Sequence, residues 1–183
     1  MRIVAGSAKG TRLATVPPGV RPLSDRAREG LFASLGDRVV GARVLDLYAG
    51  TGALGIEALS RGAEAAVFVE RARTAVRAIH ENLERARLAG RGTVVAAEVL
   101  AFLRRPGRPG APFDLVLADP PYDLPVEELE AVLAELARGW LAPGFTVVLT
   151  RRKGSSTPVV PLHWAPARRL AYGDTLVVLM REA

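Results

Sequence analysis

From residue 43 onward, short apolar runs alternate with longer stretches of helical period, and this alternation restricts the possible folds more than any other feature of the chain. The apolar runs are Val44–Leu47, Ala65–Val69, Thr93–Ala97, Leu115–Ala118 and Thr146–Thr150. The helical patterns between them are Gly52–Arg61, Arg73–Ala89, Val99–Arg104 and Pro125–Arg138. Strands that are apolar on both faces and alternate with helices predict a parallel sheet covered on both sides.

The last part of the chain departs from this alternation. Two strand-like runs, Arg168–Tyr172 and Thr175–Met180, flank the pair Gly173-Asp174, which is typical of a tight turn between antiparallel strands. We therefore predict an α/β fold in which a doubly wound, mostly parallel sheet is closed by a C-terminal antiparallel hairpin.

Residues 1–36 form a different pattern ahead of the sheet. Strand-like pieces on both sides of the basic tip Gly6–Gly10 predict a small hairpin. After a proline-rich passage, Ser24 can cap a helix that Gly36 would end. We expect residues 1–36 to be an N-terminal extension and residues 37–183 to be the main domain.

Charge is concentrated in the first part of the chain. Residues 1–30 carry a formal charge of +4, whereas the remaining residues carry only +2 of the total of +6. A basic segment ahead of a neutral domain favours contact with a polyanion over a merely solvated surface. The residues expected to contact such a polyanion are Lys9, Arg12, Arg21, Arg26 and Arg28.

Several classes of protein are disfavoured by what the chain lacks. It has 183 residues, no cysteine and no apolar run of membrane-spanning length, and its first residues do not resemble a signal peptide. Disulfides, thiolate zinc sites and cysteine nucleophiles are excluded together. We expect a soluble, cytoplasmic protein without a membrane partner.

A glycine motif opens the first helix after the first strand of the predicted sheet. Gly50, Gly52 and Gly55 have the spacing G-x-G-x-x-G, and Glu70 ends the next strand, where it can accept from ribose hydroxyls. This pattern indicates an adenosine-containing ligand. Asp46 would repel a dinucleotide pyrophosphate but would attract the ammonium and sulfonium groups of S-adenosylmethionine. Glu98 can either accept from the adenine amine or simply adjoin a helix N-terminus.

The stretch Asp119-Pro120-Pro121-Tyr122 follows directly after the fourth strand. Consecutive prolines restrict the backbone, so the Asp119 carboxylate and the Pro120 carbonyl can be held as two fixed acceptors. With the Tyr122 ring beside them, they suit a flat substrate that carries an amino group. Without a cofactor site elsewhere, the same residues would be only a strand end and a proline turn.

Together these residues resemble the Rossmann-like S-adenosylmethionine methyltransferases that act on exocyclic nitrogens, whose signature is [DNS]-P-P-[YFW]. More narrowly, the chain resembles the bacterial 16S rRNA guanine-N2 methyltransferase (RsmD-like) family nearly end to end. The segments that carry this resemblance are Arg2–Gly6, Lys9–Leu13, Arg21–Glu29, Leu45–Gly55, Glu57–Ala63, Phe68–Glu70, Asp119–Tyr122 and Tyr172–Thr175. The chain departs from the family pattern at Tyr48, where phenylalanine is expected, and at Glu98, where aspartate is expected.

The resemblance implies specific roles. Asp119 and Pro120 would hold the target amine, and Tyr122 would stack on the base. The residues expected to contact the cofactor are Asp46, Gly50, Gly52, Glu70 and Glu98. From its position in the chain, and not from the resemblance, we expect Ser24 with the helix that it caps to hold the methionine carboxylate of the cofactor. The expected substrate is 16S rRNA or the assembling small subunit, bound by a monomer that needs no metal.

Other functions remain open at this point. The closest is an adenine-N6 methyltransferase acting on DNA or RNA, because the tetrapeptide does not distinguish two exocyclic amines. A nicotinamide oxidoreductase is disfavoured by Asp46. An assembly factor that binds the cofactor without turnover would show no methyl transfer.

Overall fold

The computed structural model describes residues 1–14 and 22–183, and its centre is one seven-stranded sheet. In chain order the strands are β1 (Arg43–Leu47), β2 (Ala65–Glu70), β3 (Gly92–Ala96), β4 (Phe113–Ala118), β5 (Leu141–Arg152), β6 (Trp164–Tyr172) and β7 (Thr175–Glu182). Across the sheet their order is β3-β2-β1-β4-β5-β7-β6. The first five strands are parallel, and β7 pairs antiparallel with both β5 and β6. This confirms the predicted fold.

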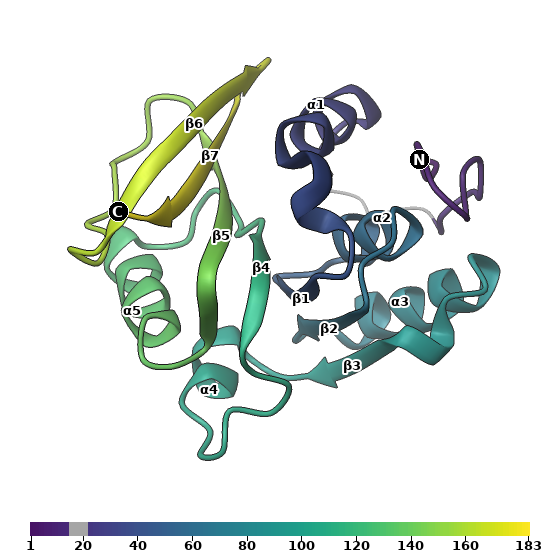
Figure 1. Ribbon diagram of the computed structural model, residues 1–183, viewed down its shortest axis with the longest axis horizontal. Coiled ribbons are helices and arrows are strands. Elements are labelled where there is room, and N and C mark those ends of the chain that lie inside the picture. The colour runs from purple at the N-terminus through teal and green to yellow at the C-terminus, as the bar shows by residue number, and fades with distance from the viewer. Residues whose placement is uncertain (15–21) are drawn as a thin grey trace.

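Helices cover both faces of the sheet (Figure 1). On one face lie α1 (Asp25–Leu35), α2 (Ala53–Ser60) and α3 (Arg73–Arg85), and on the other lie α4 (Val99–Leu103) and α5 (Val126–Leu136). Two short 3-10 helices, η1 (Gly36–Val39) and η2 (Ala89–Arg91), complete the set. The apolar side chains form one core cluster against each face, as expected for strands buried on both sides.

The predicted helix over residues 73–89 is the one whose end differs most from the structure. It ends at Arg85, and Arg87 then takes a left-handed backbone conformation with φ of 58°. The Leu88 N–H bonds the Leu83 carbonyl at 2.9 Å, which closes the helix before η2. An apolar period alone did not indicate this stop because Ala86 and Leu88 are still buried.

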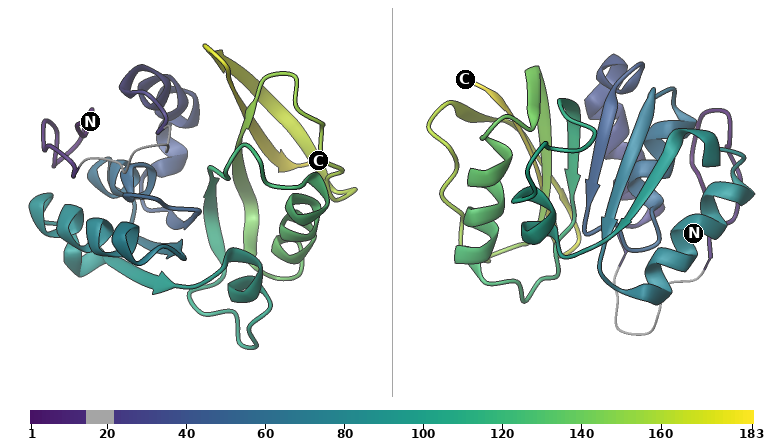
Figure 2. Two further views of the ribbon diagram at one scale, coloured as in Figure 1. Left: turned by 180° about the vertical axis from the view of Figure 1, so that it is seen from behind. Right: turned by 90° about the horizontal axis from the view of Figure 1, so that it is seen from below.

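The N-terminal segment packs onto the same face of the sheet as α2 and α3, as Figure 2 also shows. Its hairpin contains a single antiparallel bridge, Arg2 to Arg12, rather than two strands. Ile3 and Leu13 are buried in the core cluster that α2 shares, and the Ala14 N–H donates to Asn82 Oδ1 of α3 at 2.7 Å. The hairpin is therefore held by side chains of the sheet-covering helices, and a domain boundary at residue 36 stays a prediction.

Helix α1 begins and ends as the sequence predicts. The Ser24 hydroxyl accepts a hydrogen bond from the Ala27 N–H at 3.1 Å, and Gly36 ends the helix. Near its middle, α1 lies tightly against the β6–β7 hairpin. A Cβ at Gly30 would lie 1.7 Å from the Tyr172 hydroxyl oxygen, so only glycine fits there without a shift. None of the helices in the described part of the chain has the length and apolar character of a membrane span.

Candidate active site

The order of the strands places the predicted site residues at one edge of the sheet. The chain runs outward from β1 to β2 and β3 in one direction, and from β4 to β5 in the other. The carboxyl ends of β1 and β4 therefore meet at the point where the strand order reverses, which is where open α/β sheets bind ligands. Asp46 lies near the end of β1, and Asp119 directly follows β4.

Asp46 is a buried carboxylate, with 1% of its surface exposed. Its Oδ2 accepts a hydrogen bond from the Gly55 N–H at 2.9 Å. Burial raises the pKa of Asp46 well above its usual range, the Gly55 bond opposes this, and the nearby charges of Asp119 and Glu70 raise it further. The ends of three adjacent strands thus bring three carboxylates close enough to affect one another.

The third glycine of the motif is required by this packing. A Cβ at Gly55 would lie 2.4 Å from the Phe68 ring and 2.9 Å from Asp46 Oδ2. Any other residue would push α2 away from the sheet and break the bond that holds Asp46. The absence of a side chain at Gly55 is therefore needed to keep the Asp46 carboxylate in position.

Glu70, at the end of the neighbouring strand β2, holds the turn Gly50–Gly52, called the glycine loop below. Its Oε2 accepts from the Gly50 N–H at 2.8 Å, and its Oε1 accepts from the Ala72 N–H at 2.9 Å. Gly50 and Gly52 both have positive φ, 58° and 80°, which permits the sharp turn into α2. A Cβ at Gly50 would have no atom within 4 Å, so the space in front of the loop is open to a ligand.

Asp119 and Tyr122 occupy the other side of this edge. Burial raises the pKa of Asp119, and a hydrogen bond from the Thr150 hydroxyl to Asp119 Oδ1 opposes that increase. Pro120 is buried behind Asp119, whereas the Tyr122 side chain is exposed. The Tyr122 hydroxyl lies 2.6 Å from Thr175 Oγ1 of β7. The loop Asp119–Tyr122, called the proline loop below, is thus held against the antiparallel part of the sheet.

A cavity of about 630 Å³ lies beside this loop. Ser24 and Arg26, at the start of α1, form one wall, and the turn between β6 and β7 forms the other. Asp119 and Tyr122 lie in the same cavity. The structure therefore brings Asp119 and Tyr122 together with the start of α1, whereas Pro120 and the predicted cofactor residues Asp46, Gly50, Gly52 and Glu70 do not line this cavity. Asp46 lies close enough to Asp119 for the charge of Asp119 to raise its pKa.

Glu98 is placed differently from the other predicted cofactor residues. Its Oε1 forms an exposed ion pair with Arg71 at 2.9 Å, and the residue is the N-cap of α4 without a capping side-chain bond. This agrees with the second interpretation, a residue adjoining a helix N-terminus, and contact with adenine stays a prediction. Nearby Tyr48 has a buried hydroxyl without a partner among the described residues, and burial raises its pKa.

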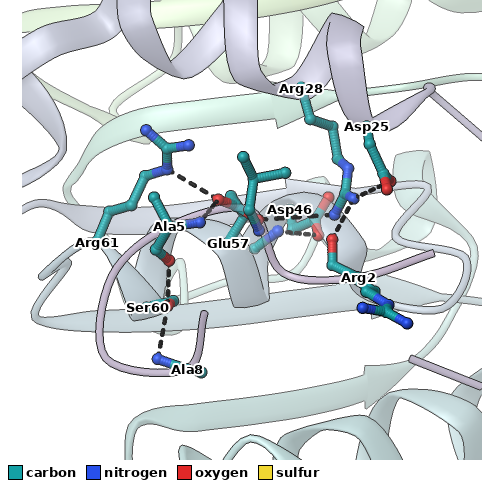
Figure 3. A network of polar contacts seen from close by, with 11 residues as sticks. Arg2, Ala5, Ala8, Asp25, Arg28, Asp46, Glu57, Ser60 and Arg61 are labelled. Atoms are coloured by element: carbon teal, nitrogen blue, oxygen red, sulfur yellow. Dashed lines mark hydrogen bonds and ion pairs between the residues drawn. The ribbon is translucent and has the colours of Figure 1, made fainter. Parts of the chain in front are cut away.

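The residues expected to bind RNA fall into three groups. Lys9, Arg12 and Arg26 are exposed, and Arg21 lies outside the described residues. Arg28 is fully buried, so the prediction that it faces RNA is wrong. Its guanidinium pairs with Asp25 and with buried Glu57, and it donates to the Arg2 carbonyl (Figure 3).

Glu57 explains why Arg28 is buried. The Glu57 carboxylate accepts from the Val4 N–H at 2.9 Å and the Ala5 N–H at 3.1 Å, and it also pairs with Arg61 at 2.9 Å (Figure 3). Arg28 supplies positive charge beside this buried acid. The pair joins α1, α2 and the N-terminal hairpin, which is a structural role that charge counting along the sequence did not distinguish from RNA contact.

Two threonines of this site were not singled out from the sequence. Thr150 and Thr175 hold the side chains of Asp119 and Tyr122, respectively. The available signal was positional, because Thr150 ends the fifth predicted strand and so lies at the same edge of the sheet as Asp119. Thr175 belongs to one of the segments that carry the family resemblance, without an assigned role.

Comparison with known proteins identifies the family of this chain and several relatives that match most of its length. The family model described as Conserved hypothetical protein 95 matches residues 1–181. The chain is 37% identical to ribosomal RNA small subunit methyltransferase D of Escherichia coli K12, covering 100% of this chain and 91% of that protein. It is 31% identical to the protein of the same name from Haemophilus influenzae, covering 90% of this chain and 84% of that one.

A solved structure has the same fold. A hypothetical protein from Thermus thermophilus superposes with a TM-score of 0.82 at 35% identity, and the match covers 98% of each chain. The similarity thus includes the N-terminal hairpin and the closing β6–β7 hairpin as well as the parallel sheet.

Proposed function

Because this chain belongs to the family described as Conserved hypothetical protein 95, we propose that it is an S-adenosylmethionine-dependent methyltransferase of small-subunit ribosomal RNA that modifies the exocyclic N2 of a guanine. The rRNA substrate is supported by the names of the full-length relatives from Escherichia coli and Haemophilus influenzae. The choice of an exocyclic amine rests on Asp119, Pro120 and Tyr122. The choice of guanine rests on the family resemblance.

The β1–β2 side of the site fits the cofactor. S-adenosylmethionine supplies a methyl group on a positively charged sulfur. Asp46 is a buried carboxylate with one backbone hydrogen bond and a raised pKa, so a cation beside it would stabilise its charged form. The open space at Gly50 leaves room for the ligand, and Glu70 stands next to it with further lone pairs for ribose hydroxyls.

The β4 side of the site fits a flat amine. The Asp119 carboxylate and the Pro120 carbonyl accept the two amine hydrogens, and Tyr122 stacks on the base. A hydrogen bond to a charged acceptor contributes about 1.5–3 kcal/mol, and stacking on an aromatic ring contributes about 1–3 kcal/mol per base. Because Tyr122 is on the exposed loop, the base reaches it only when unpaired or flipped out of a helix.

These contacts prepare the nitrogen for attack. The lone pair of guanine N2 is delocalised into the ring, and two acceptors favour a pyramidal nitrogen whose lone pair points at the methyl group. In the proposed transfer the methyl group would pass from the cofactor sulfur to the amine nitrogen, S-adenosylhomocysteine would leave, and the amine would then lose a proton. Burial raises the pKa of Asp119, which makes its carboxylate a better acceptor for that proton. In-line positioning of the reacting atoms supplies most of the remaining acceleration.

One observation carries the proposal. Asp46 of β1 is in register with Leu117 of the neighbouring strand β4, two residues before Asp119, and the charge of Asp119 contributes to the raised pKa of Asp46. A cofactor held at Asp46 would therefore lie beside an amine held at Asp119. On two distant strands the same residues would support only separate binding sites.

The experiment compares substrates directly. The protein is incubated with methyl-labelled S-adenosylmethionine and, separately, with bare 16S rRNA, assembled small subunits and DNA, and the products are digested to nucleosides. We expect labelled N2-methylguanine from one of the RNA substrates. Labelled N6-methyladenine would instead support the alternative amine, and cofactor binding without incorporation on any substrate would contradict the enzymatic function.

A further inference from the structure

Two threonine hydroxyls hold the two reactive side chains of the proline loop. The Thr150 hydroxyl donates to Asp119 Oδ1, and the Thr175 hydroxyl shares a 2.6 Å hydrogen bond with the Tyr122 hydroxyl. Both threonines come from the part of the sheet where β5 and β7 pair antiparallel. The loop that follows β4 is thus fixed from the side, by neighbouring strands, rather than only by its own prolines.

Strand register explains why these residues meet. Ala118 of β4 is in register with Leu149 of β5, so Asp119 and Thr150 are the next residues on the two parallel strands. On the other side of β5, Arg152 is opposite Thr175. Thr150 and Thr175 therefore lie on the same face of the sheet, since residues 150 and 152 share a face and opposite residues do too.

We propose that Thr150 and Thr175 are positioning residues for methyl transfer, Thr150 by orienting the Asp119 carboxylate and Thr175 by fixing the position of the Tyr122 ring. This inference rests on the proposed function, because it assumes that Asp119 receives an amine and that Tyr122 receives a base. For the closing hairpin, which also forms one wall of the cavity, it adds a role in catalysis through Thr175.

The Thr150 bond has two consequences for Asp119. It occupies Oδ1, so the carboxylate can present Oδ2 to the amine, and it stabilises the charged form against the effect of burial. The other charged or titratable groups around Asp119 are Asp46 at the end of β1, and Arg26, Tyr122, Tyr172 and Asp174 in the shared cavity. All of them remain in a variant that lacks only the Thr150 hydroxyl, so a change in pH dependence would report on this one bond.

The Thr175 bond acts on shape rather than on charge. Tyr122 is partly exposed, and one hydrogen bond at its hydroxyl end restricts movement of the side chain about its Cα–Cβ bond. A ring held in one position is ready to stack on an entering base. Loss of this bond should therefore weaken RNA binding without moving the pH profile.

The first experiment measures kcat against pH for Thr150→Val, which keeps the shape of the side chain and removes the hydroxyl. Removing the donor leaves burial unopposed and raises the pKa of Asp119, so the acid limb of the profile should move to higher pH. We expect about a tenfold lower kcat at neutral pH, recovery in Thr150→Ser, and an unchanged cofactor Kd. If Thr150→Val does not fold, Thr150→Ala is used in its place.

Thr146→Val is the matched control. Thr146 is buried on the same strand, but it is in register with Leu115, far from the proline loop. Thr146→Val should leave the dependence of kcat on pH unchanged. A Thr150 variant with the profile of the parent protein, or with the same loss at every pH as Thr146→Val, would overturn the role of Thr150.

The second experiment is a double-mutant cycle. Thr175→Val and Tyr122→Phe each remove one partner of the same hydrogen bond, so each should raise KM for RNA about three- to tenfold. The double variant should be no worse than either single one. Additive losses would show that the two hydroxyls act separately and would overturn the role of Thr175.

Failure of this inference can be told apart from failure of the proposed function. If the unmodified protein methylates RNA and the threonine variants behave like the control, only the inference is wrong. If the unmodified protein transfers no methyl group to any RNA, the function on which the inference rests is wrong. In both cases the unmodified protein is measured first.

Discussion

The two sides of the active site hold their functional groups by different means. On the β1–β2 side, Asp46 and Glu70 are bonded to backbone N–H groups of the glycine loop and of the residues after β2. On the β4 side, Asp119 and Tyr122 are bonded to threonine hydroxyls. A backbone donor is lost only through proline or through a substitution that shifts the backbone, as at Gly55, whereas a hydroxyl donor is lost in any substitution that removes the hydroxyl. On the amine side the supporting hydrogen bonds can therefore be removed one at a time without displacing the backbone.

The largest expected effect comes from removing the acceptor on the amine side. Asp119→Ala should reduce kcat/KM for RNA about 100-fold or more, because it removes a charged hydrogen-bond acceptor from the reacting nitrogen. The cofactor Kd, measured by calorimetry, should stay within about twofold, since each side of the site binds its own ligand. A parallel loss of cofactor affinity would show that the two sides do not act separately.

A smaller effect is expected on the cofactor side. Glu70→Ala should weaken cofactor binding about tenfold, because it removes the proposed ribose acceptor and also releases the Gly50 N–H that the carboxylate holds at 2.8 Å. Glu64→Ala is the control, since Glu64 is exposed just before the other end of β2. An unchanged Kd by calorimetry in Glu70→Ala would argue against any cofactor role for this residue.

The residues proposed for both sides of the site could be predicted from the sequence, but the side chains that hold them in place could not. The strands, the glycine loop and the proline loop are local patterns, and the sheet order then places Asp46 beside Asp119. The Thr150–Asp119 and Arg28–Glu57 contacts join residues 31 and 29 positions apart. No local period predicts which distant side chain a residue will meet. Arg28 was misassigned for this reason, since its charge is visible in the sequence and its buried partner is not.

The raised pKa of Asp46 gives a test of stability on the cofactor side. Below its raised pKa the folded protein keeps a proton that the unfolded chain has already lost, so stability falls as pH rises from the ordinary value towards the raised one. Asp46→Asn can still accept from the Gly55 N–H without a charge. At pH 8 we expect this variant to be on the order of 1 kcal/mol more stable, or roughly 2–4 °C higher in Tm.

The pH dependence is the control for that prediction. The difference in Tm should disappear towards about pH 4, where the ordinary aspartate is becoming protonated in both states. Cofactor affinity should fall in the same variant, because the charge that attracts the ammonium and sulfonium groups is gone. If Asp46→Asn is less stable than the parent protein at pH 8, the buried charge of Asp46 does not destabilise the folded protein without cofactor.

The smallest expected effect concerns the RNA backbone at the mouth of the cavity. Arg26 is exposed in the first turn of α1 and lines the cavity that contains Asp119 and Tyr122. If it contacts one phosphate, Arg26→Ala should raise KM for RNA about threefold and reduce the slope of log affinity against log salt by about 0.7–0.9. The cofactor Kd should not change. This combination of results would show that the start of α1 contacts RNA and not the cofactor.

Arg77→Ala provides the comparison that makes this small effect interpretable. Arg77 is an exposed arginine of α3, on the helix that covers β3 rather than the cavity, and its replacement removes the same charge. A loss of salt dependence in both variants would reflect net charge alone. A loss confined to Arg26→Ala would place a phosphate beside the start of α1, within reach of a base held against Tyr122.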